Sequence, residues 1–201
     1  MKKALAHLRA ADPVLAAVID RVGPYRPRRA APGFRTLLRA ILAQQVSTKA
    51  AATVFARLED ACGGQASAAA IAALDLETLR AAGLSRQKAG YARDLAEKTL
   101  RGEVDFELLH TLSDQEVIRI LTLVKGVGVW TAQMFLIFAL RRPDVFFPVN
   151  DLGLRNAMQR IYGMRQPPSP DRMLKIAARW RPYCSIACWY LWRSLDGDAV
   201  L

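Results

Sequence analysis

Apolar residues recur at helical spacing along nearly the whole chain, and the two-residue alternation typical of β-strands is nearly absent. The segment "SDQEVIRILTLV" shows this spacing and begins with a capping box formed by Ser113 and Glu116. The segment "FRTLLRAILAQQVSTKAAATVFARLEDAC" is predicted to be a long amphipathic helical stretch that ends at Gly63 and Gly64. The sequence therefore predicts an all-α fold.

The distribution of charge limits how the chain could hold a partner. Its 201 residues carry a net charge of +11, which favours a polyanionic partner. Residues 1–40 carry nine basic and two acidic side chains, residues 41–150 carry twelve of each, and residues 151–201 carry eight and four. The two ends would attract a nucleic acid, whereas the neutral middle would have to bind it by other means.

Two features exclude other classes of protein. The longest uncharged stretch, "GVGVWTAQMFLIFAL", is too short to span a membrane and is predicted to be a buried core helix. Cys184 and Cys188 would share one helix face, but a tetrahedral metal site needs four ligands and both histidines lie far away in the sequence. We therefore interpret the two cysteines as core residues and expect a soluble intracellular protein.

The stretch "LVKGVGVWTA" places Lys125, Gly126, Val127 and Gly128 between two predicted helices. Glycine permits a positive φ and lets an external group approach the bare backbone. Because the next helix begins at once, its unpaired N–H groups and the positive end of its dipole point out of the turn. These four residues could bind a DNA phosphate without net charge. An ordinary tight turn between packed helices explains the pattern equally well.

The surrounding segments decide between these alternatives. The segments "LTLVKGVGVWTAQM" and "DVFFPVNDLGLRN" together resemble the helix-hairpin-helix DNA glycosylase superfamily, and most closely its 3-methyladenine DNA glycosylase II branch. "AILAQQVSTKAA" and "GLSRQKAGYARDLA" match two further family segments, so the resemblance extends from about residue 34 to residue 192. It implies one glycosylase unit of two helical lobes, about 35–145 with the hairpin at 123–130, and about 1–34 with 146–201. The cleft between the lobes would receive a flipped base.

Asp151 is the candidate catalytic residue. From its position alone it is expected to be an N-cap or first-turn acid of a helix that follows an apolar loop. The resemblance places the family's catalytic aspartate at this position in "PVNDLGL", and we choose Asp151 over Asn150 because Leu154 keeps the family's buried apolar position. A carboxylate here would stabilise positive charge on the sugar and orient a water towards C1′. No second catalytic carboxylate is apparent, which suits alkylated bases that are already cationic.

The resemblance also assigns a base pocket. Family members that cleave the DNA backbone have a Schiff-base lysine where this chain has Trp130, which implies base excision without lyase activity. Lys125 does not occupy the equivalent position. Trp130 and Trp192 occupy positions that line the pocket, where aromatic rings attract a cationic base. Met134 stands where some members have tyrosine, which leaves the substrate range open.

Further DNA contacts follow from the same resemblance. Gln45 is expected to be the wedge that fills the gap left by the flipped base, with Gln44 beside it, although both could be ordinary exposed glutamines. Ser85, Arg86 and Lys88 begin a helix that Ser85 can cap, and they could contact phosphate or simply form a capped surface helix. The family's hairpin also holds a monovalent cation, Na⁺ or K⁺, through backbone carbonyls. By position these carbonyls belong to Thr122, Val124 and Val127.

The chain is thus predicted to be a monofunctional DNA glycosylase that excises bases of the 3-methyladenine type in base excision repair. We expect a monomer that acts on double-stranded DNA containing alkylated bases, without a required cofactor or a membrane. The expected location is the cytoplasm, or the nucleoid in a bacterium. The alternatives are a glycosylase for deaminated or oxidised bases and a non-catalytic helix-hairpin-helix DNA-binding protein.

Overall fold

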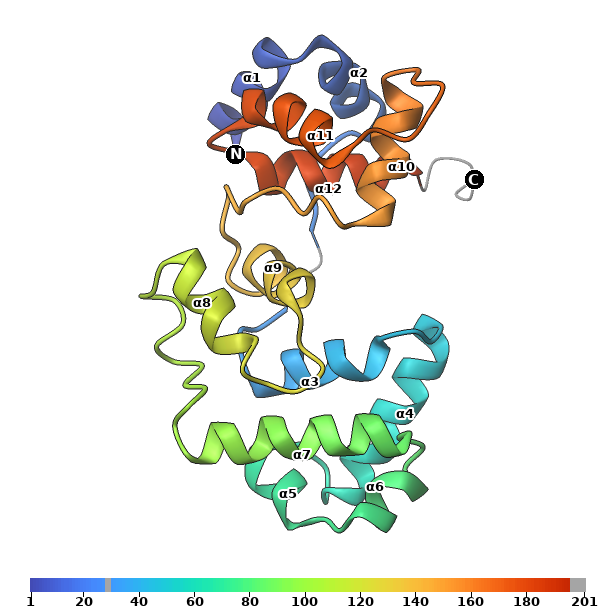
Figure 1. Cartoon of the computed structure of the whole chain (residues 1–201), viewed down its shortest axis with the longest axis vertical. Helices are drawn as coiled ribbons and strands as arrows, with labels where there is room; N and C mark the ends of the chain where they lie inside the picture. The colour runs from blue at the N-terminus through green and yellow to red at the C-terminus, as the bar shows by residue number, and fades with distance from the viewer. Residues whose placement is uncertain (28–29, 196–201) are drawn as a thin grey trace. The chain divides into compact units, whose positions relative to one another are not determined.

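The computed structural model describes residues 1–27 and 30–195. Within these ranges it contains twelve α-helices, one 3₁₀ helix and no strand, so the predicted all-α fold is confirmed (Figure 1). No helix in the described ranges is both long and apolar enough to cross a bilayer. The chain divides into two compact units, Ala30–Leu140 and Met1–Arg29 together with Arg141–Leu201. The last positions of the second predicted lobe, 196–201, lie outside the described residues.

The unit Ala30–Leu140 is organised around its longest helix, α7. Its helices are α3 (Phe34–Ala43), α4 (Thr48–Ala61), α5 (Ala68–Ala73), α6 (Leu76–Ala81), α7 (Arg86–Leu100), α8 (Asp114–Leu121) and α9 (Val129–Phe138). Helix α7 packs against α3, α5 and α6, while α3 also contacts α4 and α9. Helix α8 packs against α9, with the glycine-containing turn between them (Figure 1). This arrangement brings the turn close to α3 and α7.

The prediction of one long helical stretch from residue 34 to residue 62 is wrong. The structure divides it into α3 and α4, because Gln45 has a φ of +57°, which cannot continue a right-handed helix. Ser47 then caps α4 by accepting a hydrogen bond from the backbone N–H of Ala50 at 3.2 Å. Asp75 likewise caps α6, which begins as a separate helix shortly after α5 ends.

The second unit contains both ends of the described chain. Its helices are α1 (Lys2–Ala11), α2 (Pro13–Val22), α10 (Leu152–Ile161), α11 (Pro170–Ala177), the 3₁₀ helix η1 (Ala178–Trp180) and α12 (Cys184–Leu195). Helix α12 contacts α2, α10 and η1, and α1 packs against α2 and η1. Every residue of α12 from Cys184 to Leu191 is buried, so this helix is the core of the unit.

A buried aspartate joins four elements of this unit. The Oδ1 atom of Asp12 accepts hydrogen bonds from the backbone N–H groups of Val14 and Leu15. Its Oδ2 atom accepts from the hydroxyl of Tyr162 and, at 3.0 Å, from Nε1 of Trp180. Four donors compensate a carboxylate that is only 1% exposed. Asp12 thereby fixes the C-terminal end of α10, the helix that begins directly after Asp151.

Local predictions at helix ends hold well. Ser113 and Glu116 form the predicted capping box at the start of α8, and Ser85 caps α7. Cys184 and Cys188 are buried, as expected of core residues, and the Cys184 thiol donates to the carbonyl of Ala177.

Candidate functional site

Asp151 is held in one orientation by backbone and side-chain donors. It is the N-cap of α10, and its Oδ1 atom accepts a hydrogen bond from the backbone N–H of Leu154 at 2.7 Å. The same oxygen accepts from Nε1 of Trp192 on α12 at 3.0 Å. The residue is 7% exposed, and Leu154 is fully buried beneath it, whereas the neighbouring Asn150 is exposed. The structure therefore confirms the capping role expected from spacing and holds the carboxylate in a fixed orientation, whereas its catalytic role stays a prediction.

Gly153 makes room for this arrangement, and sequence reasoning assigned it no role. A Cβ at this position would lie 3.1 Å from Oδ1 of Asp151 and 3.2 Å from Cδ1 of Trp192. Such distances are shorter than ordinary carbon contacts, so any larger residue would press on the hydrogen-bonded pair. The available signal was a glycine in the first turn of a helix, two residues after the candidate aspartate.

Trp130 and Met134 lie in the other unit, one turn apart on α9. Trp130 is 44% exposed in the first turn of α9, although most residues that follow it in this helix are buried. Met134 is half-buried. Residues four positions apart share a helix face, so both side chains belong to one surface of α9. Their part in a base pocket stays a prediction.

The turn between α8 and α9 has the backbone expected of an anion site. Gly126 has a φ of +81°, and the N–H of Val127 donates to the carbonyl of Val124 at 3.0 Å, which closes the turn. Gly128 is the N-cap of α9 and has no side chain to accept from the first-turn N–H groups. These groups and the positive end of the helix dipole are therefore directed out of the turn.

The turn is anchored to α7 by Asp94. One carboxylate oxygen of Asp94 accepts from the backbone N–H of Lys125 at 2.8 Å, and the other accepts from Nζ of Lys98 at 2.8 Å. Burial alone would raise the pKa of Asp94, but these hydrogen bonds outweigh it and hold the pKa below its ordinary value. The Lys125 ammonium lies 3.8 Å from Asp94, and its side chain is 73% exposed. Its backbone is thus fixed while its charge faces solvent.

The two glutamines predicted at the wedge have different surroundings. Gln45 is exposed at the left-handed corner between α3 and α4. Gln44 is half-buried, and its Nε2 donates to the carbonyl of Gly126 at 2.9 Å. Gln44 is therefore bonded to the turn between α8 and α9 (residues 125–128, called the glycine turn below), whereas Gln45 does not make this hydrogen bond.

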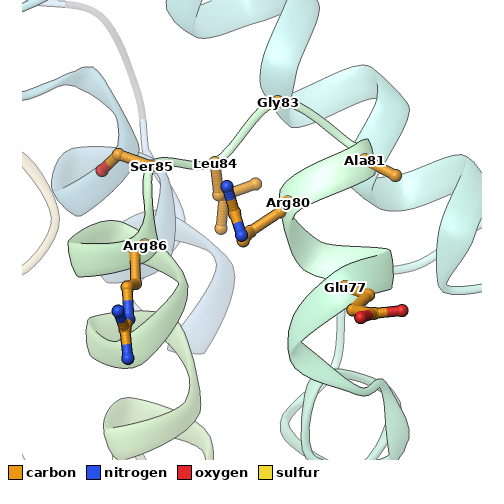
Figure 2. Close-up of a pocket in the computed structure, with 7 residues that line it drawn as sticks. All are labelled: Glu77, Arg80, Ala81, Gly83, Leu84, Ser85 and Arg86. Carbon is orange, nitrogen blue, oxygen red and sulfur yellow. The ribbon is translucent and has the colours of Figure 1, made fainter.

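Lys88 is placed differently from Ser85 and Arg86, the two other candidate phosphate contacts at the start of α7. Its ammonium donates to the carbonyls of Leu42 and Gln44, both at 2.7 Å, and burial lowers its pKa. Ser85 and Arg86 instead line a hollow in the surface at the start of α7, together with Arg80 of α6. Figure 2 shows Arg80 turned towards α7 and Arg86 on the first turn of that helix. Arg80 and Arg86 therefore lie beside Ser85 in this hollow, whereas the Lys88 ammonium is hydrogen-bonded to backbone carbonyls.

Comparison with known proteins defines the class of protein. Residues 38–182 match the HhH-GPD superfamily of base excision DNA repair proteins, and the chain belongs to this family. It is 34% identical to DNA-3-methyladenine glycosylase 1 of Schizosaccharomyces pombe over 200 residues, which cover 96% of this chain and 87% of that protein.

Two solved structures have the same fold and similar sequences. A 3-methyladenine DNA glycosylase of Schizosaccharomyces pombe in complex with abasic DNA superposes with a TM-score of 0.87 and 34% identity, covering 99% of this chain and 100% of that one. A DNA-3-methyladenine glycosidase from Bacillus halodurans gives a TM-score of 0.87 and 33% identity, with 98% and 90% of the two chains covered. The chain is thus similar over nearly its whole length to glycosylases of this type.

Proposed function

We propose that the chain is a DNA glycosylase that hydrolyses the N-glycosidic bond of alkylated bases of the 3-methyladenine type. The observation that carries this proposal is the buried carboxylate of Asp151, which Leu154 and Trp192 hold in a fixed orientation within a base excision repair family. The nearly full-length similarity to glycosylases supports both the reaction and double-stranded DNA as the partner.

A single carboxylate suits this reaction. Breaking the bond between base and sugar builds positive charge on the sugar, which a carboxylate at short range stabilises. Because Asp151 is already oriented by two donors, little reorganisation is needed when that charge develops. An alkylated base that is already cationic leaves as a neutral molecule, so the reaction needs little acid assistance. Asp151 would also orient the water that adds to the sugar.

Trp130 is proposed to contribute both to base selection and to a reaction without lyase activity. Trp130 and Met134 of α9 would contact the flipped base, and the Trp130 ring would attract its positive charge by about 0.5–2 kcal/mol. Trp130 stands in the position of the Schiff-base lysine and has no nucleophilic amine. We therefore propose that the reaction ends at an abasic site.

The glycine turn would bind a DNA phosphate through the backbone of Gly126, Val127 and Gly128. A monovalent cation could assist there. Among the described residues, the carbonyls of Thr122 and Val127 accept no backbone hydrogen bond outside the helices, and that of Val124 accepts one from Val127. Carbonyl oxygens of this kind are suitable ligands for a hard cation. We propose that the three carbonyls bind Na⁺ or K⁺, which would supply positive charge beside the phosphate.

The proposed function predicts a specific set of products. The purified protein should release 3-methyladenine from methylated duplex DNA and leave the sugar–phosphate backbone intact until alkali is added. Matched duplexes that contain hypoxanthine or uracil test the alternative lesions, with free base measured by chromatography and strand breaks on denaturing gels. Release of hypoxanthine or uracil alone would replace the proposed substrate, and strand cleavage before alkali would contradict the monofunctional assignment. DNA binding without any base release would indicate the non-catalytic alternative.

The contact between Trp192 and Asp151 gives a second prediction. Trp192→Phe keeps an aromatic ring but removes the Nε1 donor, so the rate of base release should fall about tenfold while duplex binding changes less than about twofold. Gly153→Ala should lower the rate in the same direction, because its Cβ would crowd both partners. Gly90→Ala is the matched control, since Gly90 lies in α7 and a Cβ there meets nothing within 4 Å. Unchanged rates for Trp192→Phe and Gly153→Ala would show that this contact does not orient the carboxylate.

A further inference from the structure

Three residues of α7, spaced three positions apart, contact two other segments of the same unit. Lys88 bonds to the C-terminal carbonyls of α3, Tyr91 packs on Gly126 of the glycine turn, and Asp94 bonds to Lys125 of the same turn. The spacing of these residues places them along one side of α7. The corner between α3 and α4 and the turn between α8 and α9 are therefore mounted on a common support.

The corner between α3 and α4 depends on Lys88. The last carbonyls of a helix lack intrahelical partners, and the Lys88 ammonium binds two of them, those of Leu42 and Gln44. Its positive charge also lies at the negative end of the α3 dipole. Directly after Gln44, the chain enters the left-handed conformation of Gln45. Lys88 thus fixes the backbone from which the Gln45 side chain projects.

Gln44 adds a direct connection between the two segments. Its Nε2 donates to the carbonyl of Gly126, although the two residues are 82 positions apart in the sequence. Tyr91 packs on this glycine so closely that a Cβ there would lie 2.2 Å from its ring. The carbonyl that Gln44 binds therefore has little freedom to move.

We propose that Gln44 and Lys88 are positioning residues. They hold the corner between α3 and α4, from which Gln45 projects, in register with the turn between α8 and α9. This inference rests on the proposed function, because it assigns Gln45 to the gap in the duplex and the turn to a phosphate. A wedge works only if it enters the base stack at a set distance from the backbone that the protein grips. The contacts of Gln44 and Lys88 set that distance within one compact unit.

A double-mutant cycle tests whether Gln44 acts through Gln45. The measured quantity is the ratio of affinities for two duplexes, one with a tetrahydrofuran abasic analogue beside 2-aminopurine and one undamaged. Gln44→Ala should lower this ratio about tenfold in the parent protein but less than about twofold when Gln45→Ala is already present. The fluorescence of 2-aminopurine should report the loss of wedge insertion in the same samples. An equal loss in both backgrounds would overturn the proposal, because a general structural role does not depend on Gln45.

Lys88 is tested with a charge-matched control. Lys88→Met should lower the ratio as Gln44→Ala does, and Lys88→Arg should retain most of it, because a guanidinium can also donate to two carbonyls. Lys49→Met removes the same charge from an exposed lysine of the adjacent α4 and should reduce affinity for both duplexes equally. If Lys88→Met also reduced the affinity for both duplexes equally, the positioning role would be overturned. Thermal unfolding of each variant identifies any that fails to fold. If Lys88→Met does not fold, the affinity ratio of Lys88→Arg tests the positioning role in its place.

The outcome also separates this inference from the proposed function. A parent protein that prefers the abasic duplex but releases no alkylated base would disprove the function and leave the positioning role intact. A parent protein without that preference would overturn the positioning role, whatever base it releases.

Discussion

Asp151→Asn is expected to lower the single-turnover rate of 3-methyladenine release by about 100- to 1,000-fold. The substitution removes the negative charge and changes little else. Asparagine is as good an N-cap as aspartate, and its carbonyl oxygen can accept from both Leu154 and Trp192 as Oδ1 now does. The free energy of unfolding should therefore change by less than about 1 kcal/mol. A fall in rate without a fall in stability would assign the effect to charge.

Asp75→Asn is the matched control for this experiment. Asp75 is also an N-cap aspartate, and it accepts from the backbone N–H of Thr78 at 2.7 Å, but it is exposed on α6. It should keep the parent rate. Asp151→Ala would remove cap and charge together and should be both inactive and less stable. Retention of the parent rate by Asp151→Asn would mean that Asp151 only caps α10, as its spacing alone suggests.

Features encoded by neighbouring residues were predictable from the sequence. The capping box of α8, the cap of α7 and the start of α9 directly after Gly128 depend on residues within one helical turn. The division between α3 and α4 was missed for the opposite reason. Apolar spacing continues through that region, and the signals against it, Ser47 as a cap and a non-glycine residue in the left-handed conformation, are weak in sequence.

Contacts between distant residues were not predictable in the same way. A carbonyl oxygen belongs to every residue, so nothing in the sequence indicates that Lys88 binds the carbonyl of Leu42 or that Gln44 binds that of Gly126. The resemblance brought Trp192 to the site as a pocket residue but gave no sign of its bond to Asp151. Packing in three dimensions determines these contacts, and they convert a set of candidate residues into a fixed geometry.

Gly126→Ala should have the largest effect on stability. The new Cβ would lie 2.2 Å from Cδ2 of Tyr91, and the backbone φ of +81° is unfavourable for any residue with a side chain. Steric overlap and backbone strain together should lower the free energy of unfolding by about 2–4 kcal/mol. Because the turn would have to move away from α7, binding to undamaged duplex DNA should fall as well. Urea denaturation and fluorescence anisotropy measure the two effects.

Gly128→Ala separates folding from phosphate binding. Gly128 has a φ of −93°, and a Cβ there meets nothing within 4 Å, so no contact within the protein requires glycine. Stability should fall by no more than about 1 kcal/mol, which is the cost of a poorer N-cap. Duplex binding should still weaken about tenfold, because the methyl group would stand beside the N–H groups that are proposed to bind the phosphate. Unchanged binding by a stable Gly128→Ala protein would contradict the assignment of this turn to phosphate.

The double variant Gly126→Ala with Tyr91→Ala distinguishes the two causes of the stability loss. Removing the ring relieves the overlap but leaves the left-handed backbone, which costs about 1–2 kcal/mol for a residue with a Cβ. The double variant should therefore lose less stability than the sum of the two single losses, and the difference reports the overlap alone. Strict additivity would mean that the ring of Tyr91 does not restrict position 126. The stability loss of Gly126→Ala would then come from the left-handed backbone alone.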